Sequence, residues 1–141
     1  MTSRMRLGLV TAALLGAACA GQPVFDRVAV RVSIFPDSVD VGDSVTVVVS
    51  VRNIDADVVI LSFDTDCQLL YRIVDGNNLQ VGPPSPWFCT EGKTDLTLAS
   101  GEVADTQFTW RAQVLPGQYR AYGTVGANRA REAGPVPLTV H

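Results

Sequence analysis

Two cysteines, Cys67 and Cys89, have the clearest chemistry in this sequence. The third cysteine, Cys19, lies in a segment that we expect to be removed or lipidated, which leaves these two as a pair. In an oxidising compartment such a pair forms a disulfide. Closing the loop between Cys67 and Cys89 adds about 3 kcal/mol of stability in the chain-entropy model. The alternatives are two buried free thiols or half of a metal site. A metal site is poorly supported because the only histidine is the last residue, His141.

Four aspartates are the other candidate ligands. They form two Asp-x-Asp pairs that flank the apolar run from Val58 to Phe63: Asp55, Asp57, Asp64 and Asp66. Oxygen ligands of this kind bind calcium. A strand of about six residues would nevertheless hold the two pairs roughly 20 Å apart, too far to share one ion. The spacing of a calcium-binding loop is also missing, so we interpret the four aspartates as solvated turn residues.

The residue types and charge argue against two classes of function. An enzyme needs a nucleophile with a base, a tuned pair of carboxylates or a metal, and one terminal histidine supports neither a Ser-His-Asp nor a Cys-His set. We therefore predict no catalytic residue, no cofactor and no metal. Without Arg4 and Arg6, 9 of the 11 basic residues face 14 acidic residues, a net charge of −5. Nucleic acid is thus not the expected partner, because its binding depends on neutralising phosphates.

Residues 1–20 are predicted to be a secretory signal peptide. Arg4 and Arg6 precede an apolar stretch from Leu7 to Ala18, and small residues follow. This stretch of about a dozen residues is shorter than the roughly 20 that a membrane-spanning helix needs, so a permanent anchor is the weaker interpretation. We expect an exported protein whose mature part is a single domain, residues 21–141.

The end of this segment is similar to the lipobox of bacterial lipoproteins. Leu14 to Cys19 follows the pattern in which the cysteine becomes the lipidated first residue, but Gly16 stands where a large aliphatic residue is usual. We favour cleavage before Cys19 and its lipidation, which would tie the protein to a membrane of the cell envelope through that lipid alone. Ordinary cleavage after Ala20 stays open and would give a periplasmic or secreted protein.

Apolar and polar residues alternate with a period of two through most of residues 21–141, which is typical of half-buried strands. The alternation is clearest in Val28–Ile34 and Val45–Val51. Shorter segments follow between glycines and prolines: 58–63, 68–74, 79–81, 96–98, 108–110, 117–125 and 136–140. No segment predicts a helix. The pattern predicts an all-β fold, an immunoglobulin-like antiparallel β-sandwich of seven to nine strands, rather than a barrel.

The segment from Asp75 to Cys89 contains the candidate residues for binding a partner. The pair Asp75 and Gly76 suits a tight hairpin turn because glycine tolerates a positive φ. The prolines of residues 83–86 predict a loop, since proline cannot donate a hydrogen bond to a sheet. This loop follows the hairpin and leads directly to Cys89.

Trp87 and Phe88 follow the prolines, on a loop that the predicted disulfide would hold in place. A rigid loop loses less entropy when it binds a partner, so these apolar side chains are candidates for a binding surface. The alternative, which we favour for Trp87, is that its side chain folds back over the edge of the core. Trp110 alternates with Phe108 and is predicted to lie in the core.

Four segments resemble the intracellular proteinase inhibitor (BsuPI) domain family, in the order in which that family has them. Arg52–Phe63 is similar to its segment of an asparagine, a polar turn, a valine and a phenylalanine, and Tyr71–Gly76 to its strand and aspartate-glycine hairpin. Leu98–Glu102 resembles its glycine-glutamate turn, and Phe108–Tyr119 its ending with tryptophan, proline-glycine and tyrosine. The match covers roughly Val45 to Val125.

The resemblance implies an immunoglobulin-like sandwich and a founding activity of inhibiting a bacterial serine proteinase. This sequence departs from the family in its export signal and in the proline run and predicted disulfide between Gly82 and Cys89, where the family has a tryptophan-bearing strand. No inhibitory residue can be carried over. We expect a non-catalytic, exported binding module whose protein partner is a serine proteinase. The alternative is a structural, protein-interaction or glycan-interaction domain of the cell envelope.

Overall fold

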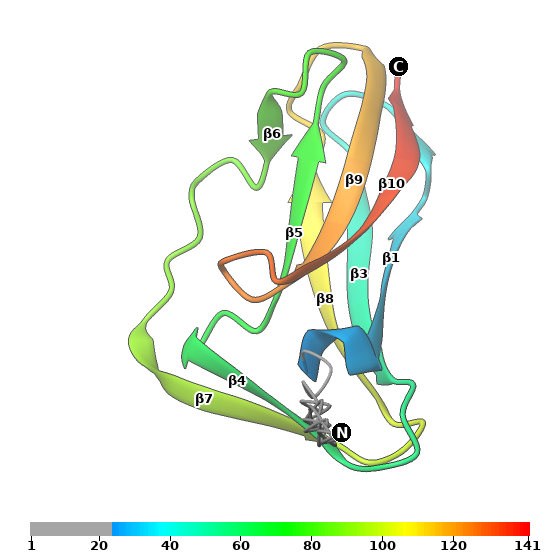
Figure 1. Cartoon of the computed structure of the whole chain (residues 1–141). Helices are drawn as coiled ribbons and strands as arrows, with labels where there is room; N and C mark the ends of the chain where they lie inside the picture. The colour runs from blue at the N-terminus through cyan, green and yellow to red at the C-terminus, as the bar shows by residue number, and fades with distance from the viewer. Residues whose placement is uncertain (1–23) are drawn as a thin grey trace, which may run out of the picture.

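The computed structural model describes residues 24–141, which fold into an all-β, immunoglobulin-like sandwich (Figure 1). The predicted signal peptide and the lipidation site at Cys19 lie outside the described residues. Within the described part of the chain, no helix has the length and apolar character needed to cross a membrane. The only helical element there is η1, one turn of 3-10 helix at Val24–Arg27.

Ten strands follow η1. In chain order they are β1 (Val28–Phe35), β2 (Ser38–Val39), β3 (Ser44–Asn53), β4 (Val59–Thr65), β5 (Leu69–Val74), β6 (Gln80–Gly82), β7 (Glu91–Leu98), β8 (Val103–Arg111), β9 (Gly117–Val125) and β10 (Arg131–Val140). The predicted seven to nine strands are slightly too few because β2 has only two residues, and so short a strand leaves no alternation to detect. β6, of three residues, was predicted near its observed place.

Two sheets enclose the core. One has the strand order β1-β3-β8 and the other has the order β2-β10-β9-β5-β6. Neighbouring strands are antiparallel except β2 and β10, which are parallel. The alternation in β3 explains the packing, because every second residue from Val45 to Val51 is fully buried between the sheets.

β4 and β7 form a separate two-stranded ribbon, which we call the arm. The arm crosses the base of the sandwich, and the chain turns from β4 into β5 at residues 66–68 (Figure 1). Val59, Leu61 and Leu98 are buried on its inner face, while Ile60 on the opposite face is exposed. The arm therefore shares the core of the sandwich without joining either sheet.

Two local contacts are typical of this fold. The hydroxyl of Tyr119 donates a hydrogen bond to the carbonyl oxygen of Leu115 at 2.6 Å, the tyrosine corner of immunoglobulin-like sandwiches. Trp110 is only 2% exposed, which confirms its predicted place in the core. Gly82 makes room for it, because a Cβ atom at this position would lie 2.7 Å from Nε1 of Trp110.

A buried asparagine attaches the arm to β3. Nδ2 of Asn53 donates hydrogen bonds to the carbonyl oxygens of Asp57 (2.7 Å) and Leu98 (3.0 Å). Its Oδ1 accepts one from the backbone N–H of Asp55 at 2.8 Å. The amide nitrogen and the carbonyl oxygen of the Asn53 side chain thus both have partners, in the turn before β4 and at the end of β7, as a buried amide requires.

Candidate partner-binding site

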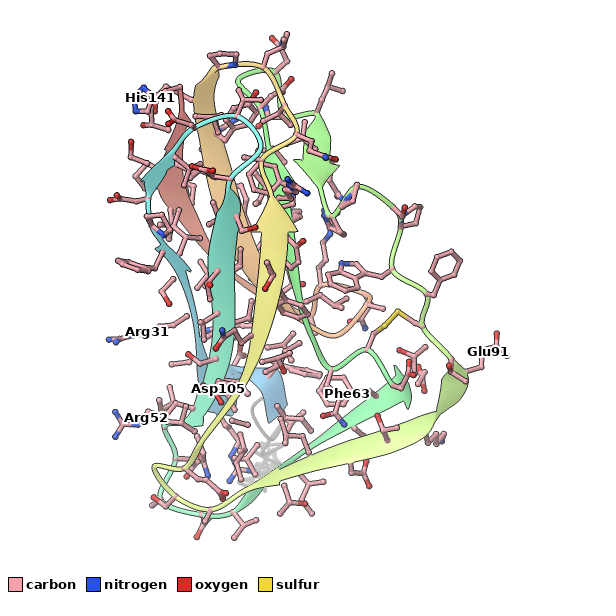
Figure 2. All side chains as sticks on the ribbon, turned by 180° about the vertical axis from the view of Figure 1, so that it is seen from behind. Arg31, Arg52, Phe63, Glu91, Asp105 and His141 are labelled. Carbon is pink, nitrogen blue, oxygen red and sulfur yellow. A yellow bond between two sulfur atoms is a disulfide. The ribbon has the colours of Figure 1, made fainter. Side chains whose placement is uncertain are left out.

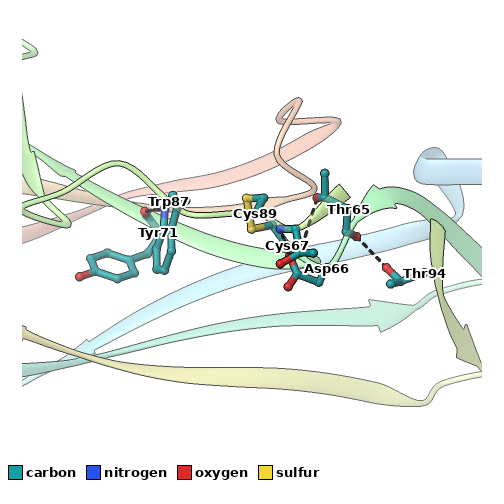
Figure 3. The surroundings of a disulfide bond; sticks show 8 residues. Thr65, Asp66, Cys67, Tyr71, Trp87, Cys89 and Thr94 are labelled. Atoms are coloured by element: carbon teal, nitrogen blue, oxygen red, sulfur yellow. Dashed lines mark hydrogen bonds between the residues drawn. A yellow bond between two sulfur atoms is a disulfide. The ribbon is translucent and has the colours of Figure 1, made fainter. Parts of the chain in front are cut away.

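The disulfide predicted between Cys67 and Cys89 is present, with 5.4 Å between the two Cα atoms. It joins the segment between β4 and β5 to the residue pair that precedes β7 (Figure 3). Asp66 and Thr90 exchange two hydrogen bonds beside it, at 3.2 Å and 2.8 Å. We call residues 83–90 the proline loop, and these contacts hold its C-terminal end.

Trp87 closes the open side of the sandwich. Its ring packs edge-on against Tyr71, with centroids 5.4 Å apart, and lies 5.2 Å from the ring of Phe108. Its Nε1 donates a hydrogen bond to the carbonyl oxygen of Tyr71 at 3.2 Å. Burial raises the pKa of Tyr71 to about 12, so this phenol stays protonated at physiological pH. The interpretation that Trp87 folds back over the core edge is confirmed.

Phe88 has the opposite orientation. Its side chain is 91% exposed, although the residues on either side are fixed by the packing of Trp87 and by the disulfide at Cys89. Single exposed apolar residues are common on protein surfaces. Phe88 differs in that the partly buried Trp87 ring holds the chain on one side and the Cys89 disulfide holds it on the other. The proline loop therefore presents one aromatic side chain in a fixed position.

A groove of about 260 Å³ lies next to Phe88. It is lined by residues of the turn between β4 and β5, the start of β5, the proline loop and β8: Asp66, Cys67, Leu69, Trp87, Phe88 and Thr106 among them. This volume is below the roughly 300–1,000 Å³ of pockets that enclose small ligands. The groove is better suited to single side chains of a larger partner.

Asp75 and Gly76 lie away from this groove. They form the predicted hairpin between β5 and β6, in which Oδ1 of Asp75 accepts hydrogen bonds from the backbone N–H groups of Asn77 (2.8 Å) and Leu79 (2.9 Å). The positive φ that the turn needs, 65°, falls at Asn78 rather than at Gly76. The hairpin and Cys67 are at opposite ends of β5, roughly 25 Å apart for an extended chain. The structure does not bring Asp75 and Gly76 together with Phe88.

Two of the four aspartates around β4, Asp55 and Asp66, make local side-chain contacts. Asp55 forms an ion pair with Arg27 at 2.5 Å, and this hydrogen bond lowers the pKa of the Asp55 carboxyl group. Oδ1 of Asp66 accepts the bond from Thr90 described above. Among residues 24–141, no three or more histidine, cysteine or acidic side chains lie close enough together to hold a metal ion.

Sequence reasoning missed the part of the site that β8 contributes. The pattern indicated only the end of this strand, Phe108 to Trp110, whereas β8 begins at Val103. Phe108 and Trp110 face inward, and Thr106 lies on the same face of β8. Thr106 is exposed because the proline loop does not cover it. The missed half has no apolar alternation, since Asp105, Thr106 and Gln107 follow one another.

No protein-family model matches the sequence, and no curated protein matches it. Among solved structures, the chain is similar to part of an alkylpurine DNA glycosylase from Pseudomonas fluorescens bound to DNA containing an abasic site analog, with a TM-score of 0.51 and 10% identity. It is also similar to part of a β-glucosidase from Erythrobacter marinus, with a TM-score of 0.50 and 17% identity. The similarities cover 82% and 81% of this chain but only 30% and 15% of those chains.

A CARDB domain from Pyrococcus furiosus, solved in complex with di-metal ions, has 17% identity and a TM-score of 0.47 over 81% of this chain and 87% of that chain. At such low identity, similarity between structures speaks for the fold and not for activity. The strand order makes this chain an all-β sandwich of immunoglobulin-like fold, and the glycosylase and β-glucosidase structures each contain a part of similar fold.

Proposed function

We propose that this chain is a non-catalytic, exported module that binds a protein partner through Phe88 on the proline loop. The observation that carries the proposal is an aromatic side chain, 91% exposed, on a backbone held by a disulfide and by the packing of Trp87. The resemblance to the BsuPI family makes inhibition of a serine proteinase the first activity to test.

The energetics of association favour such a loop. Burying a phenylalanine side chain contributes about 1.5–3 kcal/mol, and little entropy is lost because the loop is already ordered. Aromatic anchors of this kind dominate the binding energy of many protein interfaces. A partner that accepts Phe88 in a pocket would therefore gain roughly ten- to a hundred-fold in affinity from this one side chain.

The test compares two matched phenylalanines. Phe88→Ala should raise the inhibition constant for a target proteinase by at least about ten-fold. Phe35→Ala is the control, because Phe35 is 78% exposed on β1 and lies outside the groove. Inhibition constants are measured against a panel of serine proteinases. Equal effects of the two substitutions would show that Phe88 is not the contact residue.

A folded protein that inhibits no proteinase of the panel would count against the inhibitor hypothesis. The alternative, an interaction domain of the cell envelope, would then be tested by affinity capture from envelope extracts with the original protein and the Phe88→Ala variant side by side. A non-proteinase protein that only the original protein captures would support it. A glycan captured equally by the original protein and the Phe88→Ala variant would instead move the site away from the proline loop.

Export and lipidation are part of the proposal. The disulfide between Cys67 and Cys89 supports an oxidising compartment. The mass of the intact protein, purified from its native envelope, tests both points: we expect a diacylglyceryl-modified chain that begins at Cys19. An unmodified chain that begins near Gly21 would indicate ordinary cleavage, and one that begins at Met1 would contradict export.

A further inference from the structure

One long edge of the sandwich has no neighbouring strand in the described part of the chain. β8 is the last strand of its sheet and pairs with β3 alone. Two hydrogen bonds at the ends of this pairing show which residues of the two strands are bonded to each other. Asn53 N–H donates to Glu102 C=O (2.9 Å), and Ala112 N–H donates to Asp43 C=O (2.8 Å). Because bonded pairs alternate along antiparallel strands, every second residue of β8 directs its N–H and C=O groups away from β3: Val103, Asp105, Gln107 and Thr109.

The groove lies along this edge. Thr106 of β8 forms one wall, Trp87 and Phe88 of the proline loop form the other, and Leu69 is part of the floor. The proline loop passes beside β8, but its contact there is the packing of Trp87 on Phe108 rather than backbone pairing. Phe88 therefore stands at the rim of a groove whose other border offers a row of free backbone donors and acceptors.

Acidic side chains lie on both faces of the lower part of this edge. Asp66 lines the groove and Glu91 follows the proline loop at the tip of the arm, whereas Asp105 on β8 lies on the opposite face of its sheet from Thr106 (Figure 2). All three are exposed, and the nearby cations are Lys93 on β7 and Arg52, which pairs with Val103 beside Asp105. At the upper end of β8, Arg111 donates a hydrogen bond to the carbonyl oxygen of Gly42 at 2.8 Å. Three acidic side chains against two cations leave the lower part of this edge acidic, which favours a cationic ligand.

We infer, on the basis of the proposed function, that the partner binds as an extended, basic protein segment that adds a strand to β8. Backbone pairing with the free edge would supply affinity, as in other cases of strand addition. Side chains of an added strand alternate between two directions. Apolar ones would enter the groove beside Trp87 and Phe88, and lysine or arginine side chains would lie near Asp105.

Alternate N-methylation of a peptide tests the backbone pairing. The probe is a fluorescein-labelled heptapeptide of alternating lysine and valine, and its dissociation constant is measured by fluorescence anisotropy with the purified protein at low ionic strength. An extended peptide presents its N–H groups to two opposite edges. Two methylated probes are compared, one N-methylated at every lysine and one at every valine; these are the two methylation registers. The register whose N–H groups face β8 should bind at least about ten-fold more weakly than the unmethylated probe, and the other register less than about two-fold more weakly.

Equal effects of the two methylation registers would overturn strand addition, and so would failure of the unmethylated probe to bind. A heptapeptide of alternating glutamate and valine should bind at least about ten-fold more weakly than the lysine–valine probe. Equal affinity for the two peptides would overturn the basic character of the partner.

Two charge reversals test the position of the segment. Asp105→Lys should weaken binding of the lysine–valine probe several-fold, and added salt should reduce the difference. Asp37→Lys changes the net charge by the same amount at an exposed position between β1 and β2, and should leave the affinity within about two-fold. Equal effects of the two variants would remove β8 as the binding edge.

The two proposals fail separately. If Phe88→Ala abolishes capture of a natural partner but the methylation registers have equal effects, the proline loop binds and β8 does not receive a strand. If the registers differ but Phe88→Ala changes nothing, β8 receives a strand without Phe88, and the proposed function must be revised.

Discussion

At the scale of single residues, Trp87 and Phe88 show how neighbours in an extended segment acquire different roles. Successive side chains of extended backbone point in opposite directions, so Trp87 can pack on the core edge while Phe88 faces away from it. Trp87 contacts Tyr71 and Phe108, and Phe88 points to solvent. Stability and binding should therefore be separable at two adjacent positions.

Trp87→Ala should lower the free energy of unfolding by about 2–4 kcal/mol, because it removes the ring that closes the core. Phe88→Ala should change it by less than about 0.5 kcal/mol, as expected for an exposed side chain. Urea titrations followed by circular dichroism measure both values. A large loss of stability in Phe88→Ala would mean that this ring packs against the domain, and the proposed binding surface would fall with it.

Tyr119→Phe removes the hydroxyl of the tyrosine corner and leaves the carbonyl oxygen of Leu115 without this donor. The expected loss is about 0.5–1.5 kcal/mol in the free energy of unfolding, the usual net value of one such hydrogen bond. Tyr122→Phe, on the same strand, is the control. If both variants have the stability of the original protein, the corner contributes nothing to the fold.

At the scale of elements, the arm depends on a few polar contacts more than on strand pairing with either sheet. Asn53 alone bonds the end of β3 to the turn before β4 and to the end of β7. Thr94 adds a second contact, since its hydroxyl donates to the carbonyl oxygen of Thr65 at 2.8 Å within the arm (Figure 3). The position of the arm also affects the proline loop, which leads directly into β7.

Asn53→Leu should destabilise the protein by about 2–4 kcal/mol, because two carbonyl oxygens and one N–H group lose their partner inside the fold. Asn53→Asp keeps the acceptor oxygens but loses the amide donor, and should also be destabilised. Hydrogen exchange followed by mass spectrometry should show faster exchange in β4 and β7 than in β3. Uniform acceleration over all strands would contradict a local role for this side chain.

At the scale of the whole molecule, the disulfide and the ion pair of Arg27 connect parts that are distant in sequence. The disulfide spans a sequence separation of 22, and the ion pair joins the end of η1 to the turn after β3. Both act where the chain leaves a sheet. Their loss should change stability without changing the strand order.

The double variant Cys67→Ala, Cys89→Ala should have a free energy of unfolding about 3 kcal/mol lower than that of the original protein. This is the value expected for the loop that the disulfide closes. It should also bind a partner of Phe88 more weakly, because the proline loop is then less restrained. Urea titration and the inhibition assay measure the two effects. A variant of unchanged affinity would show that the disulfide serves stability alone.

The pH dependence of stability should include a contribution from Asp55. The hydrogen bond from Arg27 holds the pKa of this carboxyl group below its ordinary value of 3.8. Its stabilising effect is therefore present above pH 3.8 and is lost as the pH falls through the lower pKa of the folded state. Asp55→Asn and Arg27→Gln should each show a smaller fall in urea midpoint between about pH 5 and pH 2 than the original protein. An unchanged fall in both would exclude this pair as a source of acid sensitivity.

Several strands could be predicted because local alternation and tertiary burial agree in them. In β1 and β3 each apolar residue of the pattern faces the core, so a period of two was sufficient. β10 was predicted only from Val136 onward, although it begins at Arg131. Its first half contains Pro135 and a shift of register between Ala133 and Val136, and such an irregular segment has no regular pattern to read.

By itself, the sequence determined the all-β fold, the core place of Trp110 and the pairing of Cys67 with Cys89, because these follow from local periodicity, residue type and the scarcity of other cysteines. Only the tertiary structure decided which candidate binding residues share a surface. It separated Asp75 and Gly76 from Phe88 by the length of β5, and it placed Phe88 beside the free edge of β8. The physical reason is that strand order brings distant segments together, and the pattern within a single strand does not specify its neighbours.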